Sequence, residues 1–301
     1  MKPLFLQEFS PSRQILKNTH SFAIGRSAID HSIQMHGASR RGAITQLRRG
    51  KVLPMADLFR DARLKIERAN EHIADVNATI ALIVESNTAT TEINPESGQQ
   101  EIKHGIPDFE DRARKLSLIV GDAIHNLRTA LDFAWIGILD RKSIPYERDH
   151  VGFPVRETLE KFKAAINGTR VQTDCPALFN FLFDEVQPYQ GGNNGVIWAL
   201  HNLDISDKHL LVLGLRPAAS IHGAVIRNKD GKLIRASTWL IQDSGPYIIP
   251  IDRDMHVEDE GQLAFKMTIE EGGIFKGLEI SSLLSSFSQF VHYVVNRFNT
   301  I

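Results

Sequence analysis

The sequence predicts an α+β protein in which a bundle of long helices is followed by an antiparallel β-sheet and a C-terminal helix. Apolar residues recur every three or four positions over 56–83, which is the period of a helix with one buried face. Residues 210–275 instead contain short apolar runs separated by turn signals, and helical periodicity returns after residue 280. Because most of the expected strands follow the long helices in one stretch of the 301 residues, the chain is expected to form an α+β fold.

The first helix, over 56–83, carries a narrow apolar seam that suits either a helical hairpin or a dimer interface. The stretch "TTEINPESGQQEIKHG" then predicts a β-hairpin that turns at Pro-Glu-Ser-Gly. Asp108 is a suitable N-cap for a second helix, which is expected over 109–139. The seam consists of Phe59, Ala62, Ile66, Ala69, Ile73, Val76, Ile80 and Ile83.

The remainder is predicted to complete a single α+β domain over 55–301, with its helical part at 55–208 and its sheet at 209–275. The sequence "VGFPV" is expected to be extended, and a short apolar helix should end near Pro188. "NKDGK" predicts a hairpin turn within the sheet. The expected strands lie near 222–228, 233–242, 246–251 and 262–270, and the closing helix is expected over 280–298.

Residues 1–54 differ in charge from the rest of the chain. They hold nine Lys or Arg and two acidic residues, whereas the other residues hold 26 basic and 34 acidic ones. Three readings stay open: a weakly ordered leader or mis-chosen start, a functional basic arm, and a targeting peptide. Nucleic-acid binding is expected only if it uses the basic stretch 40–51, because the acidic remainder lacks a basic face for phosphate.

The stretch "GDAIHNLRTALD" (121–132) contains the first candidate site. On a helix, its apolar residues share one face and its polar residues share the other. Asp, Asn, His and Thr are poor helix formers, so this polar stripe is costly for a face that only meets solvent. A solvated face, a buried hydrogen-bond network and a ligand or catalytic site all remain open. The polar residues are Asp122, His125, Asn126, Arg128, Thr129 and Asp132.

A second polar segment, "LHNLDISDKHLL" (200–211), repeats the letters "HNL". If it is helical, His201, Asp204 and Lys208 stack on one side with Asp207 adjacent, while Asn202 and His209 lie elsewhere. The alternative is a pair of salt bridges and one core histidine. We expect the two motif helices to pack together, with His125 and Asp132 facing 204–209. We also expect Arg128 to pair with Asp204 or Asp207.

Together with "FPV", "QPY" and "LDISDKHLLVL", the first motif resembles an uncharacterised family of bacterial proteins with a GDxxHNLRxALD motif and a later DKH motif. The similarity runs from about Ala56 to the end of the chain. The family has no assigned activity, so the resemblance implies positions and no chemistry. These positions are Gly121, Asp122, His125, Asn126, Arg128, Asp132, Asp207, Lys208 and His209.

The motifs favour a hydrolase- or nuclease-like site. His125 is the expected general base, oriented by Asp132, with Arg128 holding an anion. Asp122, Asp207, Lys208 and His209 are expected to complete the catalytic set. Asn126, His201, Asn202 and Asp204 are expected to bind ligand. A divalent Mg, Mn, Fe or Zn ion is a possible cofactor. Its candidate ligands are Asp122, His125, Asp132, His201, Asp204, Asp207 and His209.

The alternative is a non-catalytic binding or oligomerisation protein in which the same residues form a structural network. A homodimer through 56–83 and 109–139 is a possible partner arrangement. There is no nucleotide-binding glycine motif, no HExxH and no GxSxG, and the single Cys175 excludes an intrachain disulfide. No membrane-spanning run or secretory signal is visible, so a cytoplasmic location is expected.

Overall fold

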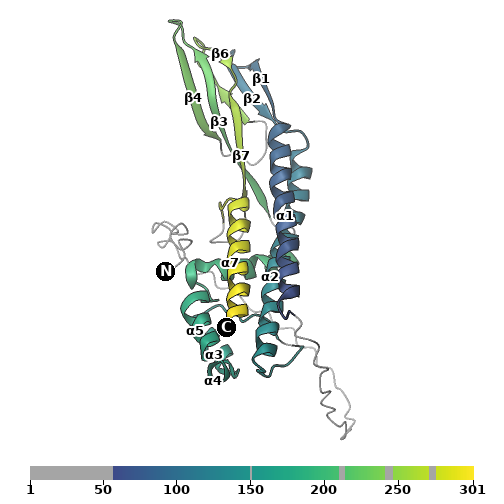
Figure 1. Ribbon diagram of the computed structural model, residues 1–301. Helices are drawn as coiled ribbons and strands as arrows, with labels where there is room; N and C mark the ends of the chain where they lie inside the picture. Colours follow the sequence, from purple (N-terminus) through teal and green to yellow (C-terminus); the bar gives the residue numbers. More distant parts are fainter. Residues whose placement is uncertain (1–56, 150, 210–213, 241–246, 271–275) are drawn as a thin grey trace, which may run out of the picture. The chain divides into compact units, whose positions relative to one another are not determined.

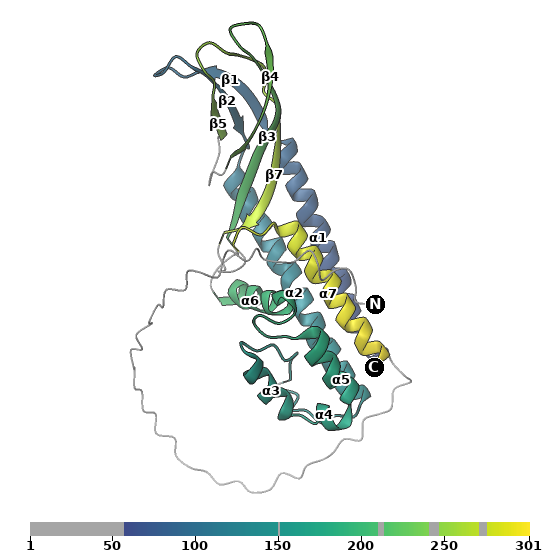
Figure 2. The same ribbon diagram turned by 90° about the vertical axis from the view of Figure 1, so that its left-hand side faces the viewer.

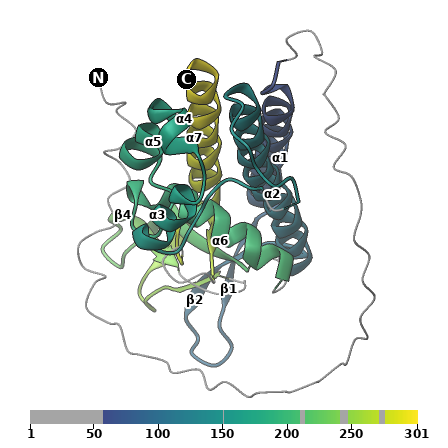
Figure 3. The same cartoon turned by 90° about the horizontal axis from the view of Figure 1, so that it is seen from below.

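Three long helices lie side by side in the computed structural model, which describes residues 57–149, 151–209, 214–240, 247–270 and 276–301. They are α1 (Arg60–Glu85), α2 (Phe109–Arg141) and α7 (Ile280–Thr300), each in contact with the other two (Figure 1, Figure 3). The predicted leader, 1–54, lies outside the described residues.

The apolar seam of α1 is buried within the chain. Most of its residues are fully covered, whereas Ile73 and Ile80 are half-buried at its rim. His72 is also buried there, although the apolar pattern did not single it out. The seam that favoured a hairpin or a homodimer therefore serves the intrachain contacts of α1 with α2 and α7.

The helix ends differ in how closely they follow their sequence signals. Asp108 precedes α2 as predicted, but its φ of 52° is left-handed and its side chain caps no amide, so the predicted capping role is wrong. Glu279 caps α7 instead, because its carboxylate accepts from the amides of Ser281 and Ser282. This cap also places a negative charge at the helix N-terminus, where the helix dipole favours it.

The chain between α2 and the sheet forms shorter helices. These are α3 (Leu159–Asn167), α4 (Val171–Asp174), α5 (Pro176–Phe181), a π-helical turn η2 (Leu182–Val186), a 3₁₀ turn η3 (Asn193–Gly195) and α6 (Val196–His209). The single helix expected before Pro188 is thus α5 and η2, which end at the left-handed Gln187. His209 is the last residue of α6, at the predicted boundary between the helical part and the sheet, and 210–213 lie outside the described residues.

The described strands form two antiparallel sheets rather than the single predicted one (Figure 2). The predicted hairpin of β1 (Thr88–Ile93) and β2 (Gln100–Gly105) is confirmed, and β5 (Tyr247–Pro250) pairs with β2. In the second sheet, β3 (Leu215–Arg227) is central. It pairs with β4 (Leu233–Leu240) through the predicted hairpin, and with β6 (His256–Asp259) and β7 (Gln262–Ile269). Strand β6 was not predicted.

An aromatic cluster joins the helices near the polar motifs. Trp135 of α2 meets Phe153 edge to face, with ring centroids 6.1 Å apart, and Phe298 of α7 contacts both rings. Phe181 of α5 also packs on Phe298. Because Phe153 lies in the extended segment 151–155, the cluster holds that segment against α2, where its backbone reaches Arg128 and Asp132.

Gly137 allows α1 to begin close to α2, and its replacement by Ala is expected to destabilise the protein. A Cβ at this position would lie 2.7 Å from the Leu58 carbonyl oxygen and 3.3 Å from the Phe59 ring. Relief of this overlap should cost about 1–3 kcal/mol, against a gain of about 1 kcal/mol in helix propensity. We expect a net loss of unfolding free energy in urea denaturation. Gly168→Ala is the control, since a Cβ there meets only ordinary contacts at 3.5 Å and beyond. Equal stability of both variants would contradict the prediction.

Candidate functional site

The two polar motifs meet through His125 and Asp204. His125 Nδ1 lies 3.0 Å from Asp204 Oδ1, which joins α2 to α6 as predicted. The His125 side chain is 47% exposed, whereas that of Asp204 is 7% exposed. The buried carboxylate of Asp204 therefore binds one nitrogen of the His125 ring, while the rest of that ring is exposed to solvent. This hydrogen bond fixes both the orientation and the tautomer of the ring, with the proton on Nδ1.

The buried Arg128 lies beside this pair, at the centre of a partly buried network. Its Nη1 donates to Asp132 Oδ1 at 2.6 Å, its Nη2 to the Phe153 carbonyl at 3.2 Å and its Nε to His201 Nδ1 at 3.2 Å. Asp132 Oδ1 also accepts the Phe153 amide at 2.7 Å. The guanidinium thus ties α2 to α6 and to the extended segment, with all three of its nitrogens used.

His201 is the neutral member of this network. Burial and, to a lesser extent, the adjacent Arg128 cation lower its pKa from 6.5 to about 4, against the opposing effects of Asp204 and Asp132. The Arg128 Nε–H donates to Nδ1, so Nδ1 must be the unprotonated nitrogen. At neutral pH, His201 is therefore an acceptor that helps to hold Arg128.

The remaining candidate residues make their contacts outside the Arg128 network. Asn126 accepts from Lys65 Nζ at 3.0 Å and donates to the Asp122 carbonyl at 2.8 Å, so it links α2 to α1. The Asp122 side chain is exposed. In α6, Asn202 donates to the Trp198 carbonyl of its own helix at 2.7 Å.

Two predicted contacts are corrected by this geometry. Arg128 does not pair with Asp204, because its ion pair is with Asp132, one turn along its own helix. The alternative predicted partner, Asp207, has its side chain outside the described residues. Asp132 does not orient His125, since it binds Arg128 and the Phe153 amide, and Asp204 takes the orienting role. Asp207, Lys208 and His209 complete the last turn of α6, but their side chains lie outside the described residues.

Sequence reasoning missed Lys65 and Phe153 as partners of the motif. Phe153 takes part through its backbone, which a residue-type pattern cannot reveal, although "FPV" belongs to the family-like pattern. Lys65 is an ordinary surface residue type on α1, and nothing in the sequence indicates its contact with Asn126.

The possible metal site gains no support from the described side chains. Among them, no group of three or more His, Cys, Asp or Glu residues is placed to hold a metal ion. Asp122 is exposed, and Asp132 and His201 bind Arg128. The side chains of Asp207 and His209, which were also candidate ligands, lie outside the described residues.

Comparisons with known proteins add no identity. No protein-family model, no curated protein and no solved structure matches this chain. No helix in the described part of the chain is long and apolar enough to cross a membrane.

The low pKa of His201 predicts a loss of stability in mild acid. The unfolded chain takes up a proton near pH 6.5, whereas folded His201 resists it until about pH 4, so its contribution is complete above pH 6.5 and declines toward pH 4. Because the ring is only half-buried, solvent screening should reduce this loss to about 1–2 kcal/mol. His201→Gln keeps an acceptor for Arg128 without the titration. We expect unfolding free energies of this variant to fall less steeply over that pH range. Parallel pH profiles for the two proteins would contradict the assignment.

Proposed function

We propose that the chain is a hydrolase in which His125 is the general base and Asp204 orients it. His125 Nε2 would take a proton from a water molecule while the water oxygen attacks an acyl or phosphoryl centre. The protonated ring would then give that proton to the leaving group as its bond breaks. Asp132 and Arg128, for which the sequence predicted roles in catalysis, would instead support the His125–Asp204 pair.

The His125–Asp204 hydrogen bond is the observation that supports this proposal. A general base needs one free ring nitrogen in reach of substrate and a second nitrogen held by an acceptor. His125 meets both requirements: Nδ1 binds the buried carboxylate, and Nε2 makes no hydrogen bond to another described residue. Its 47% exposure leaves the ring open to a substrate.

The Arg128 network supports the proposal indirectly. It joins α2 to α6 one turn from His125, through His201, and so helps to fix the distance across which His125 reaches Asp204. Precise positioning of a catalytic pair requires that the supporting side chains have locked orientations. The DKH segment, 207–209, begins three residues after Asp204 and is proposed to contribute substrate contacts.

An activity screen tests the proposal. Purified protein is tested against chromogenic esters, amides and phosphodiesters, with and without divalent metal, and every turnover is repeated with His125→Gln. His292→Gln is the control, because His292 is an exposed histidine on α7. Turnover that is lost only in His125→Gln supports the proposal. Turnover that both variants retain would refute the assigned base.

A non-catalytic role is the second candidate, favoured by the completeness of the Arg128 network. Every nitrogen of the guanidinium has a protein partner, which is the pattern of a structural element rather than of an anion site. No turnover in the screen, together with strong destabilisation by loss of Arg128, would favour this reading. A cytoplasmic location is proposed with either function.

A further inference from the structure

Strand β1 has an open edge. Its residues Thr88–Ile93 pair with β2 on one side, and no other described strand pairs with β1 on the opposite side. All of its side chains are exposed except that of Thr91, which is half-buried. Thr91 Oγ1 also donates to Glu260 at 3.0 Å, which fixes the strand beside the turn between β6 and β7.

Hydrogen bonds around the hairpin show which backbone groups face this edge. The Asn94 amide donates to Gln99, and the Ile251 amide donates to Gln100, so the Gln100 carbonyl points away from β1. Backbone groups alternate in direction along an antiparallel ladder. Glu101 and Lys103 therefore face β1. In the observed register, the N–H and C=O groups of Ala89, Thr91 and Ile93 point outward.

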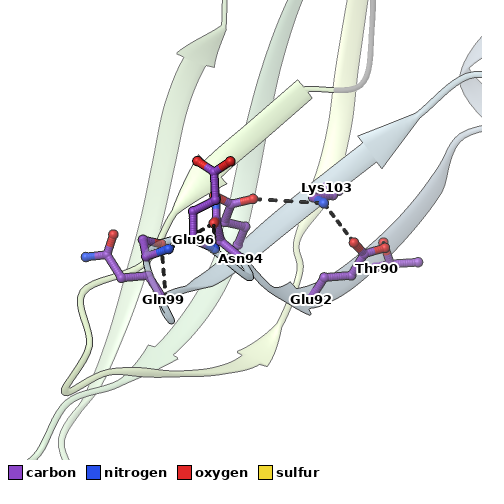
Figure 4. A network of polar contacts seen from close by, with 8 residues as sticks. Thr90, Glu92, Asn94, Glu96, Gln99 and Lys103 are labelled. Carbon is purple, nitrogen blue, oxygen red and sulfur yellow. Dashed lines mark hydrogen bonds and ion pairs between the residues drawn. The ribbon is translucent and has the colours of Figure 1, made fainter.

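This edge lacks the usual protection against pairing. Edge strands are commonly protected by lysine, proline, short length or a bulge. Strand β4 carries the exposed Arg235, and β5 has four residues and ends in Pro250. In β1 the single charge is Glu92, which is neutralised by Lys103 Nζ at 2.7 Å (Figure 4). The rest of the strand is threonine, alanine and isoleucine, and threonine and isoleucine favour β-structure.

We propose that the β1 edge binds the same edge of a second copy of this chain. An antiparallel register centred on Thr91 places it opposite the partner's Thr91, with Ala89 opposite the partner's Ile93. All three outward-facing residues then form ladder pairs in both directions, giving about six backbone hydrogen bonds.

The side chains are compatible with this two-fold register. Glu92 lies opposite the partner's Thr90, so no like charges are directly opposed. Ile93 is 68% exposed, although it shares its face of the hairpin with the fully buried Ile102. Pairing covers Ile93 with the partner's Ala89. The contact is isologous and closes at two copies, giving one continuous sheet in the order β5-β2-β1-β1-β2-β5. This inference is independent of the proposed hydrolase activity.

Sedimentation equilibrium of the full chain over a concentration series tests the proposal. We expect a concentration-dependent dimer. Ile93→Lys adds a charge to the edge, and Ala89→Pro removes an outward N–H while leaving the hairpin ladder intact. Each should weaken dimerisation at least about tenfold, which corresponds to the loss of about 1.4 kcal/mol. Ile248→Lys is the matched control, because Ile248 is an exposed isoleucine on the edge strand β5.

Amide hydrogen exchange supplies a second, residue-level readout. The amides of Ala89, Thr91 and Ile93 should become slower to exchange as the chain concentration rises, whereas that of Thr90, already directed at β2, should not change. Circular dichroism verifies that each variant is folded. A wild-type monomer at all concentrations would overturn the proposal. So would a dimer that is equally weakened by Ile248→Lys, or that leaves exchange at these three amides unchanged.

Discussion

Replacement of Arg128 by Met should produce the largest loss of stability of any single change in the polar motifs. The substitution keeps much of the side-chain volume but removes the cation from a position where the Arg128 side chain is 10% exposed. It leaves the Asp132 carboxylate without its ion pair, and the Phe153 carbonyl and His201 Nδ1 without their donors. Breaking a buried pair on one side typically costs about 3–5 kcal/mol. The Asp132 side chain is 33% exposed, so we expect about 2–4 kcal/mol.

Urea denaturation of Arg128→Met and Arg170→Met measures the effect against a matched control. Arg170 forms the same i, i+4 pair with Asp174, but its side chain is 65% exposed. An exposed pair contributes about 0–1 kcal/mol, so Arg170→Met should unfold almost as the wild type does. If both variants lost the same small amount, Arg128 would not be the structural centre of the motif. It would then be free for the anion-binding role that the sequence first indicated.

The second large effect concerns the proposed activity. For a substrate found in the screen, His125→Gln should lower kcat by about 10²–10⁴-fold, the usual contribution of a positioned general base. Asp204→Asn removes the charge that orients the ring and should also lower kcat. If His125 and Asp204 act as one catalytic unit, their losses of kcat should not add. The double variant should then be no slower than His125→Gln alone.

Kinetics of the wild type, both single variants and the double variant across pH test this assignment. Asp61→Asn, an exposed carboxylate near the start of α1, is the control and should be indistinguishable from wild type. If the loss of kcat in the double variant equalled the product of the two single losses, His125 and Asp204 would act separately. An unchanged kcat in Asp204→Asn would likewise remove the orienting role from that carboxylate.

Much of the fold could be predicted from local signals. The seam of α1, the hairpin of β1 and β2, the turn after Asn228 and the apolar face of α7 each depend on neighbouring residues, whose periodicity or turn chemistry is visible in the sequence. The Arg128–Asp132 pair belongs to the same class, because residues four apart share one helix face. We predicted instead that Arg128 pairs with a carboxylate of the second motif and overlooked Asp132, the nearer partner.

By itself, then, the sequence determined that the polar residues of 121–132 lie opposite an apolar face and that the two motif helices have reason to meet. Only the tertiary structure decided that Asp204, not Asp132, holds His125, and that the Phe153 backbone closes the Arg128 network. The tertiary structure also decided that β5 pairs with β2, which is distant in sequence, rather than with the strands next to it along the chain. These contacts join residues far apart in the chain, and a hydrogen-bond partner there is selected by the packing of whole elements. Residue types and their spacing in the sequence do not reveal which partner this packing brings into contact.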